Sequence, residues 1–154
     1  MTSFDGSMAF VVGGSLGIGL AVGERLAEGG ADIVVFARRS ELLLKAADTI
    51  RRRSRRPQQR VEWRQLDVAD RNQVESVLGA TVAELGAPDV LVNCAGRARP
   101  TYFEKVTPAQ LEETLRINLV GSWNTIQTLV PHMRRRGGYI VNTASLAGLI
   151  GVFG

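Results

Sequence analysis

Residues 8–19 read MAFVVGGSLGIG, and the fold class can be inferred from this stretch outward. The apolar run at 8–12 is bounded by glycines and predicts a short buried strand. Gly13, Gly17 and Gly19 follow with the spacing G-x-x-x-G-x-G, and residues 18–28 then have helical spacing. Glycine permits positive φ and a close approach of the backbone to a ligand. The stretch therefore predicts a strand, a tight turn and a helix N-terminus that favours an anion.

The glycine spacing excludes two better-known motifs. It does not fit G-x-G-x-x-G, because Val22 lies three residues past Gly19, and no lysine follows the last glycine as in a Walker P-loop. A purely structural turn is the alternative reading. The position directly after the first strand favours a phosphate-binding turn. The glycines have the same use as in the two other motifs, since they permit positive φ and let backbone amides approach a phosphate.

The rest of the chain repeats the pattern of strand and helix. Further strands are expected at 32–37, 60–66, 89–93 and 139–144, and the third of the five strands, at 60–66, is expected to be more exposed. Long helices between strands imply parallel pairing with right-handed crossovers. We therefore expect an α/β fold, a Rossmann-type doubly wound parallel sheet in one domain over residues 1–154. Ligands of such sheets bind beyond the carboxyl ends of the strands.

Polar residues mark the expected helix starts. Ser40 is expected to cap a helix through residue 50, and Asp70 with Gln73 to cap one that ends near Gly86. Thr107 with Gln110 forms the pattern of a capping box, and the helix after it is expected to continue to about residue 136.

Composition limits the function classes. One cysteine and one histidine among 154 residues exclude a disulfide framework and a metal site with several His ligands. The net charge of +4 comes from arginine runs at 51–60 and 134–136, which we interpret as solvated helix C-termini; contact with nucleic acid or anionic lipid is the alternative. The uncharged stretch 6–23 is too glycine-rich for a membrane span, so we expect a soluble, cytoplasmic protein.

The second strand runs into the sequence FARRS, residues 36–40. Nucleotide-binding folds that use NAD place an acid here against the ribose hydroxyls, but this chain has Ala37 followed by Arg38 and Arg39. A guanidinium can hold a 2′-phosphate with paired hydrogen bonds. The expected cofactor is therefore NADP(H); two surface arginines at a strand end are the alternative.

Five motifs, in order, resemble the short-chain dehydrogenase/reductase family. GGSLGIG (13–19) resembles the family's cofactor turn, and LDV (66–68) resembles its adenine contact. NCAG (93–96) resembles its Asn-x-Ala-Gly motif. INLVG (117–121) and VNTASLAG (141–148) contain residues that match its catalytic Asn and Ser. The resemblance implies that the cofactor-binding residues are Gly13, Ser15, Leu16, Gly17, Ile18, Gly19, Arg38, Arg39, Asp67, Val68, Asn93, Ala95 and Gly96. Val12 stands where the family usually has Thr, whose hydroxyl ties this turn to the loop after the fourth strand.

The resemblance also implies the catalytic roles. Ser145 would hydrogen-bond a substrate carbonyl, and Asn118 would hold a water of the proton relay. The family's tyrosine proton donor and its lysine lie beyond Gly154, so we expect this chain alone to be inactive. Tyr102 with Lys105 has the wrong spacing for a substitute, and Tyr139 is expected to be a packing residue.

Within the family, NCAG, LVPHM and AGLIGVFG resemble 3-ketosphinganine reductases, which reduce a long-chain ketone with NADPH at a membrane surface. Reduction of a 3-oxoacyl thioester and a non-catalytic NADPH-binding module are the alternatives. The expected partners are a small ketone, here a long-chain lipid, and further copies of the intact chain. Peripheral membrane contact is left open, and nucleic acid is not expected as a partner.

Overall fold

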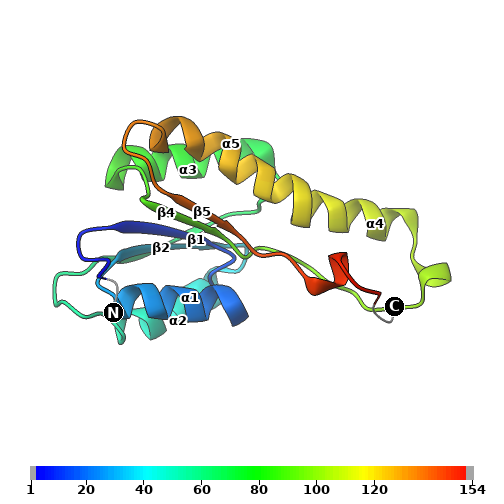
Figure 1. Ribbon diagram of the computed structural model, residues 1–154, viewed down its shortest axis with the longest axis horizontal. Coiled ribbons are helices and arrows are strands. Elements are labelled where there is room, and N and C mark those ends of the chain that lie inside the picture. The colour runs from blue at the N-terminus through cyan, green and yellow to red at the C-terminus, as the bar shows by residue number, and fades with distance from the viewer. Residues whose placement is uncertain (1–2, 152–154) are drawn as a thin grey trace.

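The computed structural model describes residues 3–151 and contains one parallel five-stranded sheet in the order β3-β2-β1-β4-β5. Figure 1 shows helices covering both faces of this sheet, with α1 and α2 on one side and α3 and α5 on the other. The strands are β1 (Met8–Val12), β2 (Asp32–Ala37), β3 (Val61–Gln65), β4 (Val90–Asn93) and β5 (Tyr139–Asn142). All neighbouring strands pair in parallel, so the doubly wound fold is confirmed.

The helices lie between the strands as expected. They are α1 (Gly17–Glu28), α2 (Ser40–Arg51), α3 (Arg71–Leu85), α4 (Pro108–Leu115) and α5 (Gly121–Met133), with a π-helical turn (Arg116–Val120) between the last two and 3₁₀ turns at Phe103–Lys105 and Leu146–Gly148. Successive β1 side chains enter opposite layers: Phe10 packs with α3 and α5, whereas Ala9 and Val11 pack with α1 and α2. This alternation makes β1 apolar throughout.

Two of the three predicted caps are confirmed. The Asp70 carboxylate accepts from the Gln73 amide at 3.1 Å, and Thr107 forms a complete capping box with Gln110. Gln73 does not close its own box, because its side chain accepts from the Asp67 amide instead. The Ser40 prediction is wrong: α2 begins at Ser40, so Arg39 takes the cap position and makes no side-chain cap bond.

The long helix predicted from 107 to about 136 is helical from Pro108 to Met133 but not uniform. The π-helical turn widens it in the middle, and the Gly121 amide donates to the Arg116 carbonyl five residues earlier. Gly121 then lets α5 approach the loop between β3 and α3, since a Cβ there would lie 2.6 Å from Cγ2 of Val68. Figure 1 shows α4 extending past the carboxyl edge of the sheet, which agrees with its lack of buried residues.

Both arginine runs lie where the sequence placed them, at the C-termini of α2 and α5. In the first run, Arg55 and Arg56 pair with Asp5, and Arg60 pairs with Asp32. These ion pairs connect the α2–β3 loop to the start of the chain and to β2. No helix within residues 3–151 is long and apolar enough to cross a membrane.

The outer strands differ from each other. β3 is partly exposed, as predicted, whereas β5 lies at the other edge with all four residues exposed. Tyr139 is 74% exposed, so its expected packing role is wrong for the described residues. It pairs in register with Val90 at the amino end of the strands, where no element of residues 3–151 buries it.

Candidate cofactor and active site

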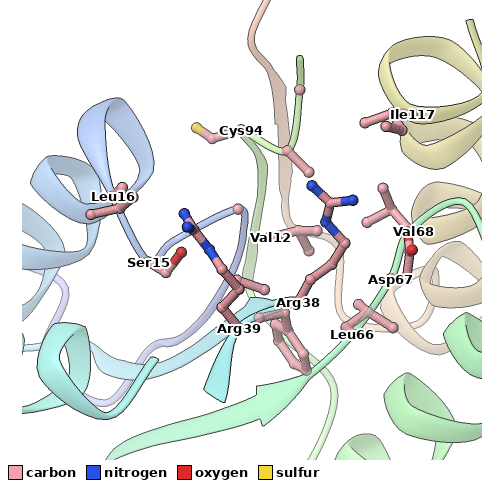
Figure 2. Close-up of a pocket in the computed structure, with 15 residues that line it drawn as sticks. Val12, Ser15, Leu16, Arg38, Arg39, Leu66, Asp67, Val68, Cys94 and Ile117 are labelled. Carbon is pink, nitrogen blue, oxygen red and sulfur yellow. The ribbon is translucent and has the colours of Figure 1, made fainter. Parts of the chain in front are cut away.

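A cavity of about 230 Å³ opens at the carboxyl edge of the sheet, between the glycine turn, the ends of β2 and β4, and the π-helical turn. Figure 2 shows side chains from these elements converging on one space. It is lined by Val12, Gly13, Ser15, Leu16, Phe36, Ala37, Arg38, Arg39, Leu66, Asp67, Val68, Cys94, Ala95, Gly96 and Ile117. Motifs far apart in the sequence thus meet where doubly wound sheets bind their ligands.

The glycine turn, residues 13–19, packs closely against the loop that follows β4, residues 94–102, which we call the β4 loop. Gly13 has φ +82°, and a Cβ there would lie 2.4 Å from the Ala95 nitrogen. A Cβ on Gly19 would lie 2.3 Å from the Gly13 carbonyl oxygen. The Cys94 amide also donates to the Val12 carbonyl at 2.7 Å. Backbone contacts therefore tie this turn to the β4 loop, although Val12 has no hydroxyl.

The N-terminus of α1 begins beside the cavity and has no side-chain cap: Ser15 and Leu16 line the cavity, whereas Gly17, Ile18 and Gly19 do not. Its N-cap residue, Leu16, is extended and makes no side-chain cap bond, and the first turn contains no acid. The Leu20 amide donates to the Leu16 carbonyl, so the amides of Gly17, Ile18 and Gly19 precede the first intrahelical bond. At Gly17 a Cβ would point into open space. The site offers amide donors and a favourable dipole to an anion.

Two arginines follow β2 directly. Arg38 and Arg39 are exposed, and Figure 2 shows both guanidinium groups extending into the space between the glycine turn and Asp67. Gln65 donates to the Arg38 carbonyl at 2.8 Å, which fixes the backbone of this segment. The neighbouring Ala37 carries no charge, so Arg38 and Arg39 bring two positive charges to this side of the cavity.

The loop after β3 forms the opposite wall. Asp67 accepts from the Ala69 amide at 3.0 Å through Oδ1. Val68 is buried, and its carbonyl accepts from Asn124 Nδ2 at 3.0 Å. With the Gln73 contact, these bonds hold the loop between α3 and α5. The structure thus brings Asp67 and Val68 to the wall of the cavity, and their contact with adenine stays a prediction.

Asn93 lies beneath the cavity, whereas its neighbours Cys94, Ala95 and Gly96 line it. It is only 3% exposed. Its Nδ2 donates to Asn142 at 2.9 Å, and its Oδ1 accepts from Thr125 at 2.8 Å. In this structure Asn93 connects β4 to β5 and α5, so it supports the site and does not line it.

The candidate catalytic residues lie past the ends of β4 and β5. Asn118 belongs to the π-helical turn, directly after Ile117, and its carboxamide bonds the backbone of Arg97 in both directions. Ser145 follows β5 and is exposed, and its Oγ accepts from the Ala147 amide at 3.1 Å. Neither lines the cavity. Lys105 Nζ lies 5.2 Å from the ring centroid of Tyr102, an ordinary cation–π contact.

Several cavity residues were not among the predicted cofactor-binding residues. They are Val12, Phe36, Ala37, Leu66, Cys94 and Ile117. Each lies within one residue of the end of a predicted strand or directly before a predicted site residue, so their position at the carboxyl edge was the available signal. Five of them have apolar side chains and the sixth is the lone Cys94, so none has a residue type that by itself predicts contact with a nucleotide.

Residues 7–154 match the short chain dehydrogenase family, and this chain belongs to that family. It is similar to 3-ketodihydrosphingosine reductase of Mus musculus, with 37% identity over 99% of this chain and 46% of the relative. Among solved structures, actinorhodin polyketide ketoreductase with NADPH has a TM-score of 0.88 and 31% identity, covering 99% of this chain and 58% of that one.

A further solved structure is an alcohol dehydrogenase of Thermococcus sibiricus complexed with 5-hydroxy-NADP. It has a TM-score of 0.86 and 27% identity, covering 96% of this chain and 61% of that one. The chain spans about half the length of the curated relative it matches. The sheet order and the family match together define a nucleotide-binding fold of an oxidoreductase family.

Proposed function

We propose that the protein is an NADPH-dependent reductase that converts a ketone to an alcohol. The observation that carries this proposal is the pair of guanidinium groups, Arg38 and Arg39, at the cavity beside the uncharged Ala37. A 2′-phosphate needs cationic bidentate partners there, and an acid would repel it.

The residues present fit such a cofactor. The uncapped first turn of α1 would hold the pyrophosphate through backbone amides, and open space above Gly17 admits it. Arg38 and Arg39 would hold the 2′-phosphate. Asp67, on the opposite wall, would accept from the adenine amine. The two solved relatives named above carry NADPH or an NADP derivative, which supports the same choice.

The bound nicotinamide would supply hydride to the carbonyl carbon, while a proton goes to the oxygen. Ser145 would donate a hydrogen bond to that oxygen and orient the carbonyl, and Asn118 would hold a water of the proton relay. We assign the proton donor to neither tyrosine of this chain. Tyr139 lies at the amino end of β5, opposite the cavity, and the ring of Tyr102 is next to Lys105.

As substrate we propose a long-chain 3-keto amine, 3-ketosphinganine, reduced to sphinganine. The support is the similarity to a mammalian 3-ketodihydrosphingosine reductase over nearly all of this chain. Reduction of a 3-oxoacyl thioester is the alternative within the family, and the polyketide ketoreductase likeness is consistent with it.

The test is NADPH oxidation by the product of the complete coding sequence, followed at 340 nm with each ketone in turn. We expect turnover with 3-ketosphinganine and a strong preference for NADPH over NADH. Turnover with only the 3-oxoacyl thioester would replace the substrate assignment. NADPH binding without turnover of any ketone would contradict reductase activity and favour a binding module.

A further inference from the structure

Arg97 contacts the helical segment 108–133 through both its backbone and its side chain. The Asn118 carboxamide accepts from the Arg97 amide at 2.8 Å and donates to the Arg97 carbonyl at 2.9 Å. The Arg97 guanidinium pairs with the Glu113 carboxylate. One residue of the β4 loop thus contacts both α4 and the π-helical turn.

The π-helical turn makes this double contact possible. Glu113 and Asn118 are five residues apart, and in a regular α-helix residues at that spacing face different directions. A π turn bonds residue i to i+5, which brings residues five apart closer to one line. Glu113 lies before the turn and Asn118 within it, so the two side chains reach the same loop residue.

Any residue except proline at position 97 could make the two backbone hydrogen bonds, but the ion pair with Glu113 requires the arginine. The side chains of Arg97 and Glu113 are 28% and 31% exposed, less than most ion-paired side chains of this protein. Partial burial reduces solvent screening, so such a pair restricts the loop more than a surface pair does. Arg97 immediately follows Gly96, which lines the cavity, as Ile117 does beside Asn118.

We propose that Arg97 is a positioning residue for the reductase site. Its ion pair with Glu113 holds the β4 loop against the helix so that Asn118 keeps one orientation beside the cavity. Arg97 touches neither substrate nor cofactor in this assignment and acts through Asn118. The assignment rests on the proposed function, because it gives Asn118 a place in the proton relay.

The experiment uses the product of the complete coding sequence and begins with three single variants. Arg97→Met keeps the stem and removes the charge, Glu113→Gln removes the partner charge, and Arg99→Met is the control in the same loop. The first readout is kcat for the ketone, with the dissociation constant of NADPH measured separately. The second is the carboxamide resonance of Asn118 in protein labelled with ¹⁵N-asparagine, identified by its loss in Asn118→Ala.

We expect Arg97→Met and Glu113→Gln each to lower kcat by roughly 10-fold, the scale of a small displacement of a site group. The double variant should lose no more than either single one, because both remove the same pair. The Asn118 resonance should move in both variants. Affinity for NADPH and all values for Arg99→Met should stay unchanged.

Either result alone in Arg97→Met, an unchanged kcat or an unchanged Asn118 resonance, would overturn the proposal. The charge-reversed pair, Arg97→Glu with Glu113→Arg, should recover most of the activity, and this separates a lost ion pair from a misfolded loop. If the wild-type protein turned over no ketone, the proposed function would fail instead. The resonance would then still decide whether the ion pair holds Asn118.

Discussion

Gly13 and Ala95 are packed so closely that no side chain fits between them. A Cβ on Gly13 would lie 2.4 Å from the Ala95 nitrogen and 2.6 Å from the Cys94 carbonyl carbon. Both neighbours are backbone atoms, which cannot turn aside as a side chain can. This contact joins the first and fourth strands of the sequence at the floor of the cavity.

Gly13→Ala should therefore destabilise the protein severely. The substitution combines a positive φ with a backbone clash, each costing about 1–3 kcal/mol. Thermal or urea unfolding of the variant is the measurement. Gly79→Ala is the control, because Gly79 lies within α3 with nothing near its Cβ position, and alanine there should stabilise by up to about 1 kcal/mol. Equal stability of the two variants would contradict the packing argument.

Arg38→Asp should reverse the cofactor preference. A paired cationic contact becomes a repulsion, which costs several kcal/mol, so NADPH should bind at least about 100-fold more weakly. NADH, which lacks the 2′-phosphate, should change little. Fluorescence titration with both cofactors is the measurement, and Arg52→Asp, at the C-cap of α2, is the matched control. A preference that survives Arg38→Asp would remove the proposed role of this arginine.

Ser145→Ala should lower kcat of the complete gene product by about 100-fold, the scale of one lost transition-state donor. NADPH affinity should remain, because Ser145 does not line the cofactor cavity. Steady-state kinetics with the ketone substrate provide the measurement. Ser76→Ala, on the exposed face of α3, should have wild-type kinetics. If Ser145→Ala kept full activity, Ser145 would have only a structural role as the cap of the 3₁₀ turn Leu146–Gly148.

Thr125→Val should test the buried contact under the cavity. Thr125 is fully buried and donates to Asn93, so valine leaves a buried acceptor without this donor at a cost of about 1–3 kcal/mol. Chemical denaturation measures the loss. Thr128→Val, half-buried on the same helix, should cost much less. A loss no larger than that of the control would show that Asn93 does not depend on Thr125.

The edge of β5 should make this 154-residue chain self-associate when it is expressed by itself. β5 pairs only with β4 among the described strands, and Ile140 and Val141 are 38% and 50% exposed. Open apolar edges pair with other strands. Sedimentation velocity at several concentrations is the measurement, and Ile140→Lys should reduce the association. A monomer at all concentrations would contradict this prediction.

Local signals in the sequence were sufficient for much of this fold. The run MAFVV, the glycines after it and the capping residues Asp70 and Thr107 each act on neighbours a few residues away. The alternation of such elements then implied a parallel sheet with its site at the carboxyl edge. Arg38 and Arg39 directly follow the carboxyl end of β2, so their sequence position was sufficient to predict that they lie at the cavity.

Other features depended on contacts that no local pattern encodes. Asn93 meets Asn142 across 49 residues, and Arg97 meets Asn118 across 21. Ser40 looked like a cap, yet the helix after β2 begins at Ser40 itself and takes Arg39 as its cap residue. Local preferences determine whether a segment is strand or helix. Which side chains meet depends on how the strands and helices pack on the shared core, and no short segment of the chain specifies that packing by itself.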